Sequence, residues 1–301
     1  MSTTLTASPS AASAPMSPLV LACLAATWVV WGSTYLAIKY ALLSLPPFFQ
    51  MGSRFLVAGL LLLGWMRWRG AALPSAREWR NALLVGTLML AGGMGGTAYA
   101  EQTVGSGLVV AFIAVVPLMI ALVNLCFGIR PQRLETAGIA VGLGGVLMLT
   151  QGAGFQASPA GLAAIAIACI TWSIGSVLSQ RSLPLAPGPM GFASEMICGG
   201  LVLLALSGLS GETPQWPPRT ESVLAWVYLV VFGSLIAFNA YMVLLQKASA
   251  GLASSYTFVN PVIAMLLGVA IAGEQVTAFE WGAVAVVLAG VVLLMWKPAR
   301  G

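Results

Sequence analysis

Ten long runs of apolar residues constrain the fold of this chain more than any other sequence feature. A helix needs about 20 mostly apolar residues to cross the hydrocarbon core of a bilayer, and each run is close to that length or longer. The runs are continuously apolar, which favours helices over the alternating strands of a membrane β-barrel. We therefore predict an all-α membrane protein with ten spans, over Pro18–Leu43, Pro47–Arg67, Trp79–Ala98, Thr103–Gly128, Leu134–Thr150, Ser158–Ser179, Pro189–Ser207, Ser222–Gln246, Gly251–Ala272 and Thr277–Trp296.

The composition excludes most enzyme classes. Charged residues make up 7% of the chain and hydrophobic residues 59%, whereas soluble proteins carry roughly 25% charged residues. The sequence contains neither Asp nor His, so Ser-His-Asp catalysis and His-ligated zinc cannot be built. An intramembrane protease or prenyltransferase, the main enzymatic alternative, relies on such residues. We expect a protein that is not an enzyme and that has no metal and no cofactor.

The basic residues orient the chain. If the N-terminus is cytoplasmic, ten of the 13 Lys and Arg side chains fall on the cytoplasmic side. They are Arg67, Arg69, Arg77, Arg80, Arg130, Arg133, Arg181, Lys247, Lys297 and Arg300. Because cytoplasmic loops of membrane proteins are enriched in Lys and Arg, we expect a multi-pass protein of the inner (plasma) membrane with both termini in the cytoplasm. The basic charge is thereby explained without a nucleic-acid partner.

The two halves of the chain resemble each other. Trp31 matches Trp172 and Gly59 matches Gly200 at an offset of 141, and Pro117 matches Pro261 further along. Each half holds five spans, an odd number, so the second copy enters the membrane the other way up. We predict two inverted five-helix repeats, over residues 18–151 and 158–297, after a disordered cytoplasmic tail at residues 1–17. Inverted repeats are typical of transporters that work by alternating access.

Several short motifs follow one another in an order that is typical of one family. They are Trp31–Lys39 in the first span, Pro46–Phe48 with Arg54-Phe55 in the second, Ala100–Gln102, Gly105–Gly107 and Pro117 up to the fourth, Thr257–Val262 in the ninth, and Gly273-Glu274 before the tenth. Together they resemble the drug/metabolite transporter superfamily, specifically its EamA-type exporters. The resemblance covers roughly residues 18 to 297.

The resemblance implies export of small metabolites. The family includes exporters of amino acids, among them aromatic amino acids, and of drugs and other amphiphiles. The superfamily also carries nucleotide sugars and triose phosphates, but this chain lacks the several membrane Lys and Arg residues that a polyanion would require. We therefore expect neutral and aromatic amino acids as substrates of a monomer or weak oligomer in the bilayer. The alternatives are a drug or other metabolite exporter of the same fold and a passive channel.

Polar and aromatic residues within the spans are the candidates for a substrate path, because such groups need partners inside a membrane. In the first span Trp28, Trp31, Tyr35 and Lys39 follow one another at spacings of three and four, on one helix face. The same residue types are as easily explained by helix packing and interhelical hydrogen bonds. We predict a cavity lined by Trp31, Tyr35, Tyr99, Trp172, Ser176, Asn239, Tyr256 and Asn260.

Five further residues are candidates for gates or hinges. Pro117 and Pro261 each remove a backbone hydrogen bond, so we expect bends in the fourth and ninth spans. Lys39, Arg54 and Glu101 lie toward the outer side, where we expect the carboxylate to pair with one of the two cations.

Two questions stay open at the level of sequence. A coupling proton could use only Glu101 or Glu195, although export down a gradient requires no coupling. The glycine cluster at Gly92–Gly96 is either a hinge or a site of close helix packing.

Overall fold

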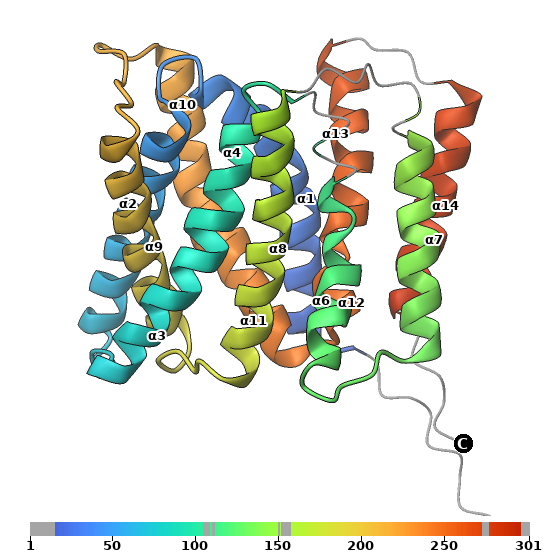
Figure 1. Cartoon of the computed structure of the whole chain (residues 1–301), viewed down its shortest axis with the longest axis horizontal. Helices are drawn as coiled ribbons and strands as arrows, with labels where there is room; N and C mark the ends of the chain where they lie inside the picture. The colour runs from blue at the N-terminus through green and yellow to red at the C-terminus, as the bar shows by residue number, and fades with distance from the viewer. Residues whose placement is uncertain are drawn as a thin grey trace, which may run out of the picture.

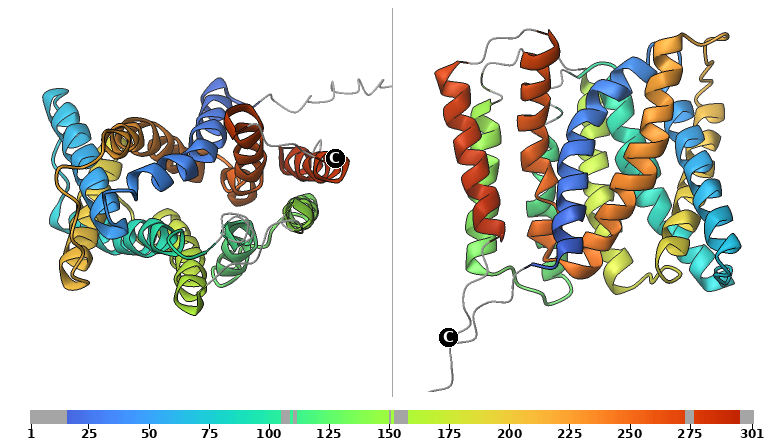
Figure 2. Two further views of the ribbon diagram at one scale, coloured as in Figure 1. Left: turned by 90° about the horizontal axis from the view of Figure 1, so that it is seen from above. Right: turned by 180° about the vertical axis from the view of Figure 1, so that it is seen from behind.

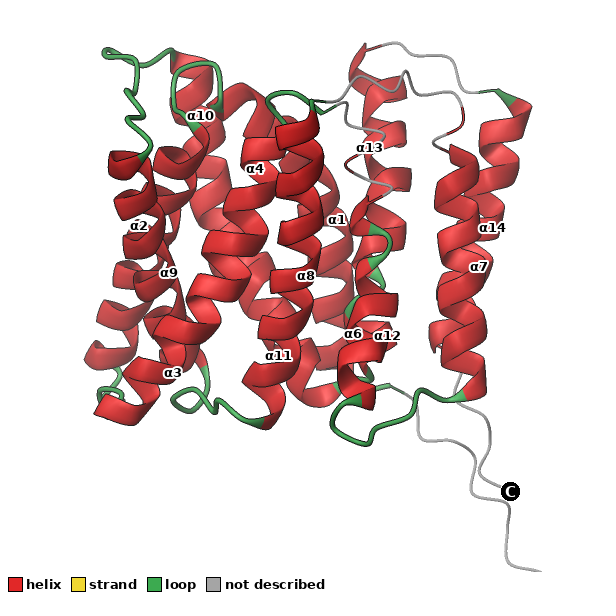
Figure 3. Ribbon diagram, viewed as in Figure 1, coloured by secondary structure: helices red, strands yellow, loops and turns green. Residues whose placement is uncertain are grey.

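The structure, a computed structural model, is a bundle of helices that stand side by side (Figure 1). It describes residues 16–104, 109, 112–149, 151, 158–272 and 277–295. Within these residues there is no β-strand (Figure 3). The prediction of an all-α fold is therefore confirmed.

Corresponding helices appear in the same order in the two halves. The first half contains α1 (Pro18–Ala41), α2 (Pro47–Trp68), α3 (Ala76–Gly86), η1 (Thr87–Gly95), α4 (Gly96–Ala100), α6 (Val116–Leu125) and α7 (Arg133–Leu149). The second contains α8 (Pro159–Arg181), α9 (Pro189–Leu209), α10 (Thr220–Tyr228), η3 (Leu229–Phe238), α11 (Asn239–Lys247), α12 (Ala250–Ala253), α13 (Tyr256–Ala272) and α14 (Ala278–Met295). The segments η1 and η3 are wider π-helical stretches inside continuous helices.

Six helices in the described part of the chain are long and apolar enough to cross a membrane: α1, α2, the continuous α3–η1–α4, α8, α9 and the continuous α10–η3–α11. The remaining predicted spans correspond to α6, α7, α12–α13 and α14. Among the described residues α6 has 10 residues and α7 has 17. The apolar spans are thus present as helices, while the count of ten stays a prediction.

Local sequence explains where the helices begin. Ser17 and Ser158 stand at equivalent positions of the two halves, and each precedes a proline. The Ser17 side chain accepts a hydrogen bond from Val20 N, and the Ser158 side chain accepts one from Gly161 N. A serine N-cap followed by proline satisfies the free amides of a first helical turn and fixes its backbone. The same local signal therefore starts α1 and α8.

Equivalent helices of the two halves pack against each other in opposite directions. Gly52 of α2 lies against Gly200 of α9, and Gly59, two turns further along α2, lies against Ala193. A Cβ atom at Gly59 would come within 2.9 Å of the Ala193 carbonyl oxygen. The helices approach this closely because glycine carries no side chain. The pair α7 and α14 is also antiparallel. This arrangement agrees with a duplicated fold.

The first helix of each half packs against helices of the other half. Helix α1 packs against α13 and η3 of the second half, and α8 packs against α6 and η1 of the first. Seen from above, α1 and α13 lie on one side of the bundle while α6 and α8 lie on the other (Figure 2). The space between the halves is therefore bounded by equivalent helices.

The two ends of the bundle carry different charges. We call the end at Ala41, Pro47 and Ala100 the upper end and the end at Pro18 and Trp68 the lower end, as drawn in Figure 1. Eight basic residues lie in the terminal turns of helices or in the adjoining loops at the lower end. They are Arg67, Arg69, Arg77, Arg80, Arg130, Arg133, Arg181 and Lys247.

At the upper end a carboxylate joins two helices. The Glu212 carboxylate, beyond the end of α9, accepts hydrogen bonds from Phe48 N at 3.0 Å and Phe49 N at 2.8 Å. These amides belong to the first turn of α2, where a negative charge is favourable. Glu212 therefore ties the end of α9 to the start of α2.

Candidate substrate cavity

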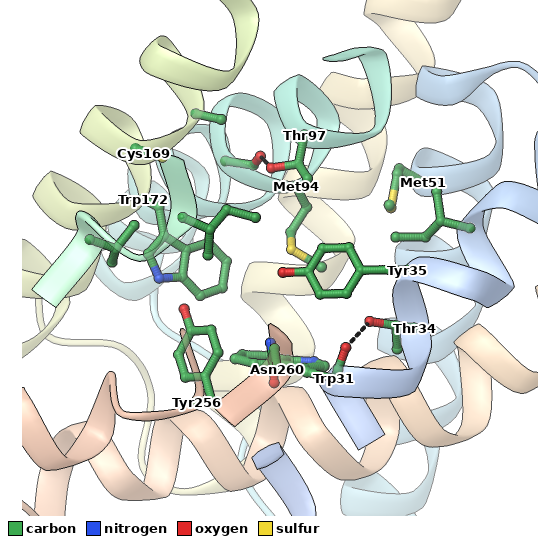
Figure 4. A pocket seen from close by; sticks show the side chains of 15 residues that line it. Trp31, Thr34, Tyr35, Met51, Met94, Thr97, Cys169, Trp172, Tyr256 and Asn260 are labelled. Atoms are coloured by element: carbon green, nitrogen blue, oxygen red, sulfur yellow. Dashed lines mark hydrogen bonds between the residues drawn. The ribbon is translucent and has the colours of Figure 1, made fainter. Parts of the chain in front are cut away.

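A cavity lies between the two halves, on the upper side of the bundle centre (Figure 4). Its walls come from both halves. The lining residues are Trp31, Thr34, Tyr35, Ile38, Met51, Gly93, Met94, Thr97, Ile113, Val116, Ala168, Cys169, Trp172, Tyr256 and Asn260. None of them carries a formal charge at neutral pH. The cavity therefore suits an apolar or aromatic group with a few polar contacts.

The cavity is small in this conformation. Its volume is about 60 Å³, which is room for a few water molecules. Ligand pockets usually measure roughly 300–1,000 Å³. A metabolite of the size of an amino acid therefore requires side chains or helices to move apart.

Four aromatic rings, which we call the aromatic cluster, pack together at the cavity: Trp31, Trp172, Tyr241 and Tyr256. The ring centroids of Trp31 and Trp172 are 5.8 Å apart with planes at 74°, and those of Trp31 and Tyr256 are 4.6 Å apart, also at 74°. Edge-to-face pairs of this kind stabilise by about 0.5–1.5 kcal/mol beyond their area burial. The cluster joins the equivalent helices α1 and α8 with α11 and α13 of the second half.

Hydrogen bonds fix the cluster. The Trp172 indole Nε1 donates to the Tyr241 hydroxyl at 3.2 Å, and that hydroxyl is 3.0 Å from Ser176 Oγ. The Trp31 Nε1 donates to the Gly233 carbonyl, in the π-helical η3, at 3.3 Å. Tyr241 lies in the helix that ends at the lower end, whereas the lining residues of α1 continue from Trp31 toward the upper end. The hydrogen-bonded cluster thus closes the cavity on its lower side.

The Asn260 side chain brings an unpaired acceptor to the cavity wall. It is buried, and within the described part of the chain its Oδ1 accepts no hydrogen bond. The hydroxyls of Thr34 and Thr97, in contrast, donate to the carbonyls of Trp31 and Gly93. Figure 4 shows the Tyr35 hydroxyl directed into the same space. An N–H group of a ligand would supply the hydrogen bond that Asn260 lacks.

Five of the eight predicted cavity residues line it: Trp31, Tyr35, Trp172, Tyr256 and Asn260. Ser176 lies behind the wall, hydrogen-bonded to Tyr241.

Tyr99 and Asn239 are not among the residues that line this cavity. Tyr99 stacks on Phe48 at 5.8 Å and is 37% exposed at the upper end. The Asn239 Nδ2 donates to the Leu235 carbonyl of its own helix at 2.9 Å.

The glycine cluster packs tightly against α8. A Cβ atom at Gly92 would come within 2.5 Å of Thr171 Oγ1, and one at Gly93 within 2.9 Å of the Trp172 ring. Gly96 lies similarly close to Ala168. These contacts favour the close-packing interpretation of the cluster. Gly93 in particular leaves the room that the Trp172 ring occupies in the cavity wall.

The predicted gate residues stand in three different settings. Lys39 is exposed near the end of α1, and Arg54 is fully buried. Glu101 directly follows the third span, and among the described residues its buried Oε1 accepts no hydrogen bond. The Arg54 guanidinium contacts Ser234 and Met51 instead, so an ion pair of Glu101 with either cation stays a prediction. Burial raises the pKa of Glu101 to about 8.

The two prolines stand in different settings. Helix α6 begins at Val116 after a turn at Ala114-Val115, so the fourth span is interrupted directly before Pro117. Helix α13 runs through Pro261 from Tyr256 to Ala272 without interruption. The break in that span lies earlier, at Ser254-Ser255. A bend at Pro261 remains a prediction.

Sequence reasoning missed Tyr241, the fully buried centre of the cluster. The internal repeat held a signal for this residue. Gly86 matches Gly233 at an offset of 147, and the same offset makes Tyr241 the counterpart of Met94, which lines the cavity.

Comparison with known proteins gives a consistent result. Residues 16–151 and again residues 159–296 match the EamA-like transporter family. An uncharacterized inner membrane transporter of Escherichia coli, YedA, is 43% identical over 270 residues, which cover 89% of this chain and 88% of YedA. Protein PecM of Dickeya dadantii is 27% identical, covering 79% of this chain and 80% of PecM. A crystal structure at 22% identity superposes with a TM-score of 0.76, covering 93% of this chain and 98% of that one, and shows the same fold.

Proposed function

Because the chain belongs to the EamA-like transporter family, we propose that it exports small amphiphilic metabolites, foremost neutral and aromatic amino acids, by alternating access. The observation that carries the proposal is the cavity between the two halves, where the equivalent residues Trp31 and Trp172 meet. Aromatic walls favour aromatic and apolar groups by stacking and by exclusion of water. The lone acceptor Asn260 Oδ1 suits an amine of the substrate.

The antiparallel packing of equivalent helices supports alternating access. Two similar halves of opposite orientation can each adopt the conformation of the other, so the cavity is reached first from one side and then from the other. In this conformation the aromatic cluster lies below the cavity. We assign the structure to a state that is closed toward the lower end, with a cavity narrower than the substrate requires.

The charge distribution supports an orientation. The eight described basic residues at the lower end support a cytoplasmic position for that end by the positive-inside rule. The inner membrane is proposed as the location because YedA is an inner membrane transporter. Substrate would then enter from the lower end and leave at the upper end.

Counterflow in proteoliposomes tests the proposal. We expect saturable flux of L-tryptophan, L-phenylalanine or L-leucine. The Trp31→Ala variant loses ring contacts with three partners and should reduce the flux at least about tenfold. Trp68→Ala is the matched control, because Trp68 is 75% exposed at the end of α2.

The other outcomes separate the alternatives. Saturable flux of amphiphilic organic cations without any flux of amino acids would assign the chain to drug export. Flux that does not saturate would identify a passive channel. Amino-acid flux that survives Trp31→Ala would keep the function and reject this cavity as its site.

A further inference from the structure

Arg54 is a fully buried cation whose hydrogen-bonding capacity is incompletely used. Its Nε donates to Ser234 Oγ at 2.8 Å, and its Nη1 lies 3.5 Å from the Met51 sulfur. The guanidinium also lies over the Phe55 ring, 4.7 Å from the centroid. Its Nη2 has no partner among the residues that the structure describes. The described groups that contact Arg54 are thus a hydroxyl, a thioether and a ring, none of which carries negative charge.

This arrangement is costly without an anion. A guanidinium stays protonated in proteins, and a buried charge is destabilising unless a counter-charge and hydrogen bonds compensate for it. Glu195 is the carboxylate at the equivalent position of the second half, and both of its oxygens are buried without a hydrogen-bond partner. Arg54 is therefore not neutralised by Glu195 in this conformation. An anion from another source would satisfy it.

Arg54 lies directly behind the cavity wall. Thr34 and Met51 both line the cavity, and both are neighbours of the guanidinium. A Cβ atom placed on Gly233 would lie 2.9 Å from Arg54 Nη2 and 3.4 Å from Thr34 Cγ2. The Met51 side chain thus lies between the cavity and the cation, since it lines the one and its sulfur is 3.5 Å from Nη1 of the other. Met is unbranched and changes rotamer easily, so a modest opening of the cavity exposes Arg54.

We propose that Arg54 binds the carboxylate of the transported molecule, so that the substrates are amphiphilic monocarboxylates with an apolar or aromatic body. The inference rests on the proposed transport function and narrows its substrate class. The planar guanidinium offers two parallel N–H groups, a geometry that matches a carboxylate. The aromatic cluster receives the body of the substrate, and Asn260 Oδ1 accepts from its amine where one is present.

Three indole ligands test the carboxylate site on the unmodified protein. L-tryptophan carries a carboxylate and an amine, indole-3-propionate only the carboxylate, and tryptamine only the amine. In competition against L-tryptophan counterflow, we expect indole-3-propionate to inhibit at a concentration at least about tenfold lower than tryptamine, as a charge-assisted bidentate contact implies. Equal or stronger inhibition by tryptamine would overturn the assignment.

A variant then identifies Arg54 as the source of this preference. Arg54→Gln should abolish the difference between the two competitors, and Arg54→Lys should restore part of it. The control is Arg67→Gln, which removes the same charge from an exposed position of the same helix and should leave the preference unchanged. Should Arg54→Gln not fold, the Arg54→Lys variant decides: a competitor preference equal to that of the unmodified protein would reject Arg54, since a single ammonium cannot reproduce a bidentate contact.

The two proposals fail in different ways. No saturable L-tryptophan flux in the unmodified protein would remove the proposed function and this inference with it. Saturable flux with the carboxylate preference unchanged in Arg54→Gln would leave the function intact and reject only the role of Arg54.

Discussion

Trp31 and Trp172 occupy equivalent positions in the two halves of the chain and meet edge to face, with ring centroids 5.8 Å apart. Neither ring is placed by its own helix alone. Trp31 is held by a hydrogen bond to the Gly233 carbonyl, and Trp172 by one to the Tyr241 hydroxyl. The two halves therefore meet at a point where a change in either one moves the cavity wall.

The Tyr241 hydroxyl should stabilise the closed lower side. In Tyr241→Phe the ring contacts remain, but the Trp172 Nε1 and Ser176 Oγ lose their shared partner. A buried donor without an acceptor costs about 1–3 kcal/mol. We expect the free energy of unfolding in detergent to fall by about this amount, which lowers the unfolding temperature. We also expect a changed ratio between the rates of substrate entry and substrate exit. Tyr40→Phe, on the exposed end of α1, should change neither.

Gly93 should tolerate no larger residue. In Gly93→Ala the added methyl would lie 2.9 Å from the Trp172 ring. Overpacking of this kind typically costs about 1–3 kcal/mol, and the displaced indole should reduce transport more than stability. Gly64→Ala is the matched control in α2, where an added Cβ meets no atom within 4 Å. Thermal unfolding and counterflow of both variants check this prediction. Equal activity of the two would contradict it.

The spans could be predicted from the sequence because each apolar run is long and its ends carry local signals. The Ser-Pro pair at Ser17 and that at Ser158 illustrate such signals. The helix breaks were harder to place. The fourth span has a turn at Ala114-Val115, shortly before Pro117, whereas the turn in the ninth lies at Ser254-Ser255, six residues before Pro261. Hydropathy gives no warning of such a break, because apolar residues continue on both sides of it.

The cavity was only partly predictable for a geometric reason. Spacings of three and four place Trp31 and Tyr35 on one face of α1, but they do not say whether that face turns toward the other half. Asn239 is not among the lining residues, and its Nδ2 donates to the carbonyl of Leu235 in its own helix. The unpaired guanidinium of Arg54 could not be predicted, because an ion pair is a property of neighbours in space.

Glu101 should make stability depend on pH. Burial raises its pKa to about 8 from an ordinary value of 4.5, so the folded protein holds a proton that the unfolded chain releases. Stability should then be greatest below about pH 4.5, fall as the pH rises to about 8, and level off above. Glu101→Gln should remove this contribution to the pH dependence of the free energy of unfolding. Thermal unfolding measured across that pH range checks it. Glu221→Gln, at an exposed position in the first turn of α10, is the control.

Glu135 should hold the lower end closed. Its Oε1 accepts a hydrogen bond from Gly251 N at 2.6 Å, which ties the start of α7 to α12. One turn into the bundle, Trp28 Nε1 donates to Ser255 Oγ at 3.0 Å, at the break between α12 and α13. In Glu135→Ala the first of these ties is lost, and a hydrogen bond to a charged group contributes about 1.5–3 kcal/mol. That loss should shift the population toward conformations open at the lower end. Limited proteolysis near Lys247 should therefore accelerate at least several-fold, whereas Glu78→Ala, in the exposed first turn of α3, should leave the rate unchanged. An unchanged rate in Glu135→Ala would show that other contacts keep the lower end closed.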